Sequence, residues 1–95
     1  MLFEWDEVKN EHNKIKHAVS FEDATTVFDD ENAIFIYDEE HSDNEERFII
    51  IGLDGMFREL TVCHCYVDNN DNVIRIISAR KATKCEIHLY LSGGY

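Results

Sequence analysis

Four basic residues near the end of the chain form a cluster that could bind a phosphate. Arg75 interrupts an apolar, largely β-branched run at 73–77, and Arg80, Lys81 and Lys84 follow it with no acidic residue between 72 and 84. The run predicts a strand that is buried on at least one face. A guanidinium inside such a strand is costly unless it is paired or opens onto a site. Arg75 is therefore either a surface residue paired with a carboxylate or part of an anion-binding site.

The charge of the chain is unevenly distributed. The formal net charge is −11, but residues 1–46 hold 15 acidic and 3 basic residues, whereas residues 47–95 hold 5 acidic and 6 basic residues. Phosphate contacts are made by Lys and Arg, so most of this surface is unsuited to nucleic acid. The asymmetry predicts two partners, with the acidic half meeting a basic protein and the basic segment meeting a phosphate.

Length and composition indicate one globular domain over residues 1–95. A chain of 95 residues with 44% hydrophobic content can build one core. No apolar run approaches the roughly 20 residues that a membrane span requires. The first ten residues lack the features of a signal peptide. Three cysteines without a framework spacing fit a reducing cytoplasm, so we expect a cytoplasmic protein without membrane contact.

Two other groups of residues have types that bind metals. Cys63, His64 and Cys65 are consecutive in a predicted strand, so His64 points away from the face that the cysteines share. They are expected to be small core residues. The acidic segment Asp38–Glu46 lacks the order of an EF-hand and is expected to be a solvated loop with His41 exposed. No phosphate-binding glycine loop and no nucleophile elbow around Ser78 are present. The sequence therefore predicts no metal and no cofactor.

The elements that must position these residues follow from periodicity and turn signals. Asp6 is a predicted N-cap, and Val8, His12 and Ile15 form a weak apolar stripe on a helix that packs along one edge. The pattern predicts an α+β fold, a small and mainly antiparallel sheet of four to five strands with two N-terminal helices and one C-terminal helix on one face. The expected strands are 2–5, 33–37, 48–53, 59–67 and one that begins near 73 after a turn at 68–72. The expected helices are 6–16, 20–29 and 81–91.

Four segments in this order resemble the BrnT-type toxins of bacterial type II toxin–antitoxin systems. They are 3–30, the acidic loop that follows, 45–53 (EERFIIIGL) and 74–83 (IRIISARKAT) with a terminal helix, and the resemblance covers nearly the whole chain. It implies a RelE-like ribonuclease fold and metal-independent RNA cleavage that inhibits translation. It also implies a hetero-oligomer with a cognate antitoxin, usually a ribbon-helix-helix DNA-binding protein.

The charged positions of that family fall on six residues of this chain, which are expected to be catalytic: Lys16, His17, Glu46, Arg47, Arg75 and Arg80. Metal-free cleavage of RNA needs a base for the 2′-OH, a cation for the phosphorane and an acid for the 5′-oxygen. Arg75 and Arg80 are the candidates for the cation, because a guanidinium fork matches phosphate oxygens.

Glu46 or His17 would be the base and His17 or Lys16 the acid, which gives a 2′,3′-cyclic phosphate. Lys81 and Lys84 are expected to bind RNA. Taken alone, His17 at a helix junction could equally be a cap or core residue, and the Glu46–Arg47 pair could be structural.

A second interpretation is a non-catalytic module that binds protein. The acidic N-terminal half would then hold a basic partner, and the arginines would only stabilise the fold. A degenerate toxin that still binds its antitoxin would combine both features.

Overall fold

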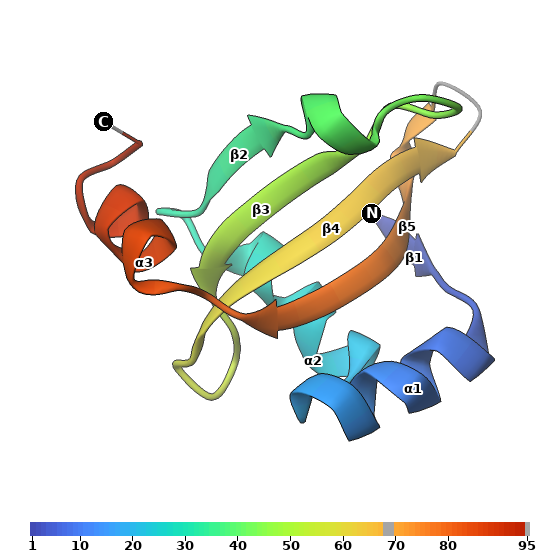
Figure 1. Ribbon diagram of the computed structural model, residues 1–95, viewed down its shortest axis with the longest axis horizontal. Coiled ribbons are helices and arrows are strands. Elements are labelled where there is room, and N and C mark those ends of the chain that lie inside the picture. The colour runs from blue at the N-terminus through green and yellow to red at the C-terminus, as the bar shows by residue number, and fades with distance from the viewer. Residues whose placement is uncertain (68–69, 95) are drawn as a thin grey trace.

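The computed structural model describes residues 1–67 and 70–94 as an α+β domain (Figure 1). The strands are β1 (Leu2–Glu4), β2 (Ile34–Tyr37), β3 (Phe48–Leu53), β4 (Glu59–Val67) and β5 (Asn70–Lys81). The helices are α1 (Glu7–His17), α2 (Phe21–Thr25) and α3 (Lys84–Leu91), with the short 3₁₀ helices η1 (Thr26–Asp29) and η2 (Glu39–His41). The predicted turn at 68–72 includes residues 68–69, which lie outside the described residues, and β5 already begins at Asn70.

The five strands form one sheet in the order β1-β5-β4-β3-β2. Only β1 pairs in parallel, with β5, and the other pairs are antiparallel. The predicted mainly antiparallel sheet with three helices is confirmed. One face of the sheet carries the core, which α2 and η1 cover from behind in the view of Figure 1. Its fully buried residues include Val19, Phe21, Val27, Ile50, Val62 and Ile74.

Helix α1 packs along the edge of β5 as expected, but it buries a polar face and exposes the apolar stripe. Its buried residues are Asn10 and Asn13, while Val8 and Ile15 are 64% and 84% exposed. The amide of Asn13 donates to the carbonyl of Ala79 at 2.8 Å and accepts from the N–H of Ala79 at 3.2 Å. Helix α1 is thus held to the strand by hydrogen bonds rather than by an apolar face.

Strand β5 continues four residues beyond the apolar run and holds the basic residues in register. The strand ends at Lys81 and α3 begins at Lys84, so the predicted start of the last helix at residue 81 is wrong. A bulge opposite Cys63 and His64 leaves Ile77 unpaired. Residues five apart on a regular strand face opposite sides, but this extra residue brings Arg75 and Arg80 to the same face.

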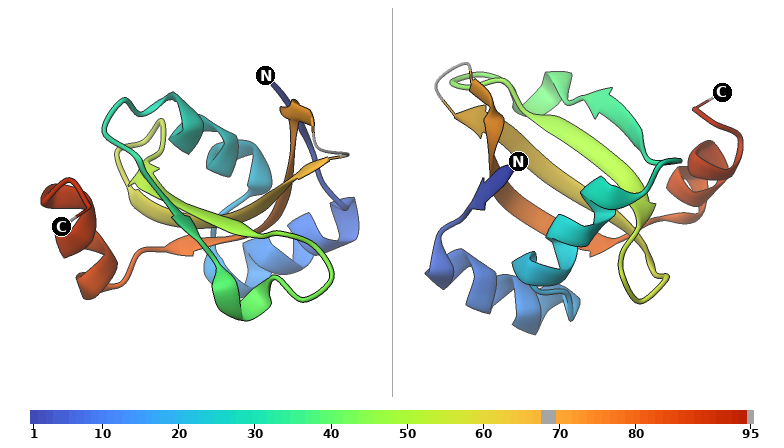
Figure 2. Two further views of the ribbon diagram at one scale, coloured as in Figure 1. Left: turned by 90° about the horizontal axis from the view of Figure 1, so that it is seen from above. Right: turned by 180° about the vertical axis from the view of Figure 1, so that it is seen from behind.

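Helix α3 lies apart from the other helices, beyond the end of β5 (Figure 2). The expectation that all helices cover one face is therefore wrong for α3. Its capping box joins Thr83 and Glu86, and the hydroxyl of Tyr90 donates to Asp30 at 2.6 Å. Because α3 does not cover the second face of the sheet, part of that face stays open beside Arg80. No helix among the described residues has the length and apolar character to cross a membrane.

Candidate functional site

A groove of about 300 Å³ lies on the second face of the sheet, between the β3–β4–β5 strands and η2. Its floor is formed by side chains that point away from the core on the three strands. Its rim is formed by the segment that joins β2 to β3. The lining residues are Asp38, His41, Arg47, Ile49, Thr61, Cys63, Ile77, Ser78 and Arg80. The groove therefore combines two guanidinium groups with an imidazole and a carboxylate.

Arg80 stands at one side of this groove in a fixed orientation. Its Nη1 and Nη2 atoms donate to the two carboxylate oxygens of Glu86 at 2.7 and 3.0 Å. This hydrogen bond to Arg80 lowers the pKa of Glu86 to about 2, and the same contact raises the pKa of Arg80. Both groups stay charged at neutral pH, so the bidentate pair holds the guanidinium in place.

Arg47 approaches the groove from the start of β3. Its Nε atom lies 3.5 Å from a carboxylate oxygen of Glu45, and this buried atom has no hydrogen-bond partner. A separation of 3.5 Å is an ion pair, but it is too long for a well-formed hydrogen bond. The Nε–H of Arg47 is therefore left without a well-formed hydrogen bond beside the groove.

His41 and Asp38 form a dyad on the rim. The imidazole Nδ1 lies 3.1 and 3.0 Å from the two carboxylate oxygens of Asp38. The carboxylate is largely buried while the imidazole is exposed, so Nε2 is left available to solvent. A histidine oriented by a carboxylate is a common general acid or base.

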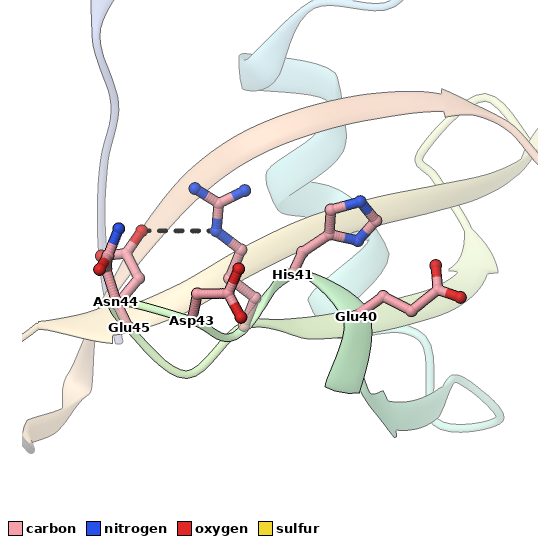
Figure 3. Close-up of a pocket in the computed structure, with 6 residues that line it drawn as sticks. Glu40, His41, Asp43, Asn44 and Glu45 are labelled. Carbon is pink, nitrogen blue, oxygen red and sulfur yellow. Dashed lines mark ion pairs between the residues drawn. The ribbon is translucent and has the colours of Figure 1, made fainter.

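A second hollow of about 460 Å³ adjoins the groove and shares His41 and Arg47 with it. Glu40, Asp43 and Asn44 contribute to its wall, and Figure 3 shows Glu45 and Glu40 far apart along it, with His41 between them. The 38–46 segment was expected to be a solvated loop, and its side chains are indeed mostly exposed. It nevertheless forms one wall of both hollows, which the sequence did not indicate.

Two of the expected catalytic residues, Arg47 and Arg80, are brought together in the groove. Arg75 is on the same face of the sheet but does not line the groove. Its guanidinium donates to Glu4, its neighbour on β1, from both Nε and Nη2 at 2.9 Å. Of the two environments expected for Arg75, the structure shows the surface ion pair, which Arg75 makes with Glu4 on the edge strand β1.

The other expected catalytic residues line neither hollow. Lys16 and His17 end α1, the first exposed and the second half-buried. Glu46 is exposed, and it is the preceding residue, Glu45, that pairs with Arg47. The expected RNA-binding residues Lys81 and Lys84 are exposed on either side of the turn into α3.

Cys65 and His64 are buried as expected, whereas the expectation of a core position is wrong for Cys63, which is half-buried and lines the groove. Cys63, Cys65 and Cys85 are all free thiols, and burial raises the pKa of Cys63 and of Cys65. His64 lies on the opposite face from both and is fully buried among aromatic rings. Within residues 1–67 and 70–94, no three His, Cys, Asp or Glu side chains are grouped as a metal site.

The fold is that of a known ribonuclease toxin. A crystal structure of the Brucella abortus ribonuclease toxin BrnT, at 1.1 Å resolution, matches with a TM-score of 0.66 and 22% sequence identity. The match covers 88% of this chain and 100% of that chain. At this identity the likeness shows the fold alone.

The sequence identifies the family. Residues 5–86 match the profile of the BrnT ribonuclease toxins of type II toxin–antitoxin systems. The chain belongs to this family, and the resemblance inferred from the sequence is confirmed. No curated protein matches the chain significantly. Membership implies an RNA substrate and an antitoxin partner.

Proposed function

We propose that the groove between η2 and the β3–β5 strands is the RNA-cleaving site of a metal-independent endoribonuclease. The observation that carries this proposal is the convergence of His41, Arg47 and Arg80 on one hollow, with Asp38 orienting the imidazole. These groups supply what cleavage by the 2′-OH requires, namely a proton carrier and fixed positive charge.

The geometry supports the following assignment of roles. His41, held through Nδ1 by Asp38, would remove the proton of the 2′-OH or protonate the 5′-oxygen through its exposed Nε2. Arg47 and Arg80 would bind the scissile phosphate and stabilise the charge that develops on it. Attack by the neighbouring 2′-OH gives a 2′,3′-cyclic phosphate and a 5′-hydroxyl. Lys81 and Lys84 would contact the RNA backbone beyond the groove.

The family consists of ribonuclease toxins of type II toxin–antitoxin systems, which supports a role for the proposed activity in such a pair. We propose that cleavage of cellular RNA in the cytoplasm inhibits translation, and that the antitoxin is a ribbon-helix-helix protein. The acidic N-terminal half supports this partner, because a DNA-binding protein carries basic surface.

Purified protein incubated with RNA tests the proposal. Cleavage should persist in EDTA and produce cyclic phosphate ends. Arg80→Ala and Arg47→Ala should each lower the rate roughly 10²–10³-fold, as expected for loss of an electrostatic stabiliser. His41→Ala should lower it by roughly 10²–10⁴-fold.

Two variants outside the groove serve as matched controls. Arg75→Ala removes a guanidinium that is paired with Glu4, and His17→Ala removes an imidazole that does not line the groove. Both should cleave within a few-fold of the parent. If His17→Ala or Arg75→Ala abolishes cleavage while His41→Ala does not, the assignment to the groove is wrong.

The second candidate function, a degenerate toxin that only binds its antitoxin, is favoured by the carboxylates that pair with the two arginines of the groove. Glu86 occupies the fork of Arg80, and Glu45 lies beside Arg47. A phosphate must share both guanidinium groups with these acids. No cleavage at any excess of correctly folded protein, together with intact antitoxin binding, would support this alternative.

A further inference from the structure

Strand β2 forms one edge of the sheet and pairs only with β3. The N–H of Asp38 donates to the carbonyl of Arg47, which places Asp38 among the residues that bond toward β3. Hydrogen bonding alternates along an antiparallel strand, so Ile36 also bonds toward β3. Phe35 and Tyr37 therefore direct their N–H and C=O groups outward. These two residues, backbone and side chain, are called the β2 edge below.

The side chains of the β2 edge are large and exposed. Phe35 is 59% exposed and Tyr37 is 48% exposed. Their rings lie 6.4 Å from Phe28 and 5.5 Å from Phe48, respectively, so they extend an aromatic cluster out to the surface. The strand Ile34–Tyr37 contains no Lys, Pro or Gly, the residues that commonly block an edge strand. An edge with these properties is suited to the addition of another strand.

The opposite side of the sheet is treated differently. There β1 is the edge strand, and beyond β1 the outer backbone of β5 at Ala79 is paired with the amide of Asn13 on α1. The chain thus closes this stretch of β5 with one of its own side chains. It leaves the β2 edge uncovered by any strand among the described residues.

Acidic residues flank the β2 edge on both sides. Asp29 and Glu31 precede the strand, and Glu39 and Glu40 follow it, all exposed and without an ion pair in the described part of the chain. No Lys or Arg occurs between His17 and Arg47. An added strand would be attracted here if basic residues stood at both of its ends.

We infer that the β2 edge is the docking site for an extended segment of the antitoxin, which adds a strand to the sheet. The segment would be apolar and β-forming at its centre and basic at its ends. The inference rests on the antitoxin partner that the family implies, and not on the assignment of the cleavage site. The β2 edge is next to η2, so a segment bound there would lie beside the groove without being part of it.

Amide hydrogen exchange of the toxin, with and without its cognate antitoxin, tests this directly. Exchange at Phe35 and Tyr37 should slow by roughly tenfold or more in the complex, because their outward N–H groups become hydrogen-bonded. Protection that appears elsewhere while these two amides stay unchanged would overturn the inference. This measurement needs no variant and no RNA cleavage.

Binding measurements on variants provide the second test. Tyr37→Pro removes one outward N–H without removing a bond to β3, and it should weaken antitoxin binding about tenfold. Tyr37→Thr keeps the N–H and should lose less. Glu39→Lys with Glu40→Lys should weaken binding in a salt-dependent manner, whereas Glu11→Lys on α1 should not.

Two further outcomes distinguish this inference from the proposed active site and from self-association of the toxin. Arg80→Ala should lower the cleavage rate roughly 10²–10³-fold and leave antitoxin binding intact, so failure of the proposed active site would not affect the docking site. If the toxin alone forms a dimer that Tyr37→Pro dissociates, the β2 edge is occupied by a second copy of the chain. That result would overturn the assignment to the antitoxin.

Discussion

Replacement of Glu86 by Gln breaks the bidentate ion pair that holds Arg80. The carboxylate of Glu86 accepts from both Nη atoms of Arg80 and from the N–H of Thr83 at 2.8 Å. Glutamine keeps one oxygen for Thr83, removes the negative charge and replaces the second acceptor oxygen with an NH2 group that cannot accept from Arg80. The variant therefore tests the ion pair without deleting the cap of α3.

The magnitude follows from the pKa of Glu86, which falls from its ordinary value of 4.5 to about 2. One pKa unit corresponds to about 1.4 kcal/mol, which sets an upper limit of roughly 3 kcal/mol. The Arg80 side chain is 39% exposed, and the cap bond to Thr83 remains in the variant. Solvent screening reduces the expected loss to about 1–2 kcal/mol at pH 7.

The pH dependence has a definite sign. A carboxyl group with a lowered pKa in the folded state stabilises the protein above the unfolded value, and this stabilisation is lost as pH falls through the folded value. The difference in unfolding free energy between parent and Glu86→Gln should thus be largest above pH 4.5. It should fall to about half or less by pH 3. Urea denaturation followed by circular dichroism at pH 7 and pH 3 measures both values, and an unchanged difference at the two pH values would refute the reasoning.

Three further changes have expected outcomes of similar size. Asn13→Leu should lower stability by about 2–4 kcal/mol in urea denaturation, because it leaves the N–H and C=O of Ala79 without partners. Burial lowers the pKa of His64 to about 4, so protonation opposes folding as pH falls from 6.5 toward 4. His64→Phe should remove that loss of stability between pH 6.5 and 4, and an unaltered pH profile of unfolding would contradict it. Gly52→Ala places a Cβ 3.0 Å from two side-chain atoms and should cost about 1–3 kcal/mol by thermal unfolding, whereas Gly55→Ala, with 3.7 Å to its nearest atom, should cost less.

The central strands were predictable because their residues are mainly apolar and are bounded by turn signals. The segments 48–53 and 59–67 are apolar runs between turn signals, and β3 and β4 occupy these same residues. The first helix was predictable in extent but not in orientation. Periodicity assumes that a helix buries its apolar face, and here Asn10 and Asn13 bind backbone groups of other segments instead.

The arginines of the proposed site were predictable because a charge beside an apolar strand is conspicuous in the sequence. Arg80 and Arg47 stand out as charges next to buried strands, and the groove contains both. Arg75 has the same sequence signal, but its partner Glu4 is 71 residues away and becomes a neighbour only through the parallel pairing of β1. His41 was missed because the loop around it is uniformly polar. The spacing of Asp38 and His41, one helical turn apart, is the signal that could have revealed the dyad.

The amide of Asn13 has an effect on how genetic data for this protein should be interpreted. It joins α1 to the carbonyl of Val19 and to the backbone of Ala79, the residue just before Arg80. A substitution at position 13 would therefore shift the strand that carries a groove arginine, although Asn13 does not line the groove. A selection for cells that survive the toxin should recover changes at this position together with changes in the groove. Such a hit would report on the placement of β5 and not on contact with RNA.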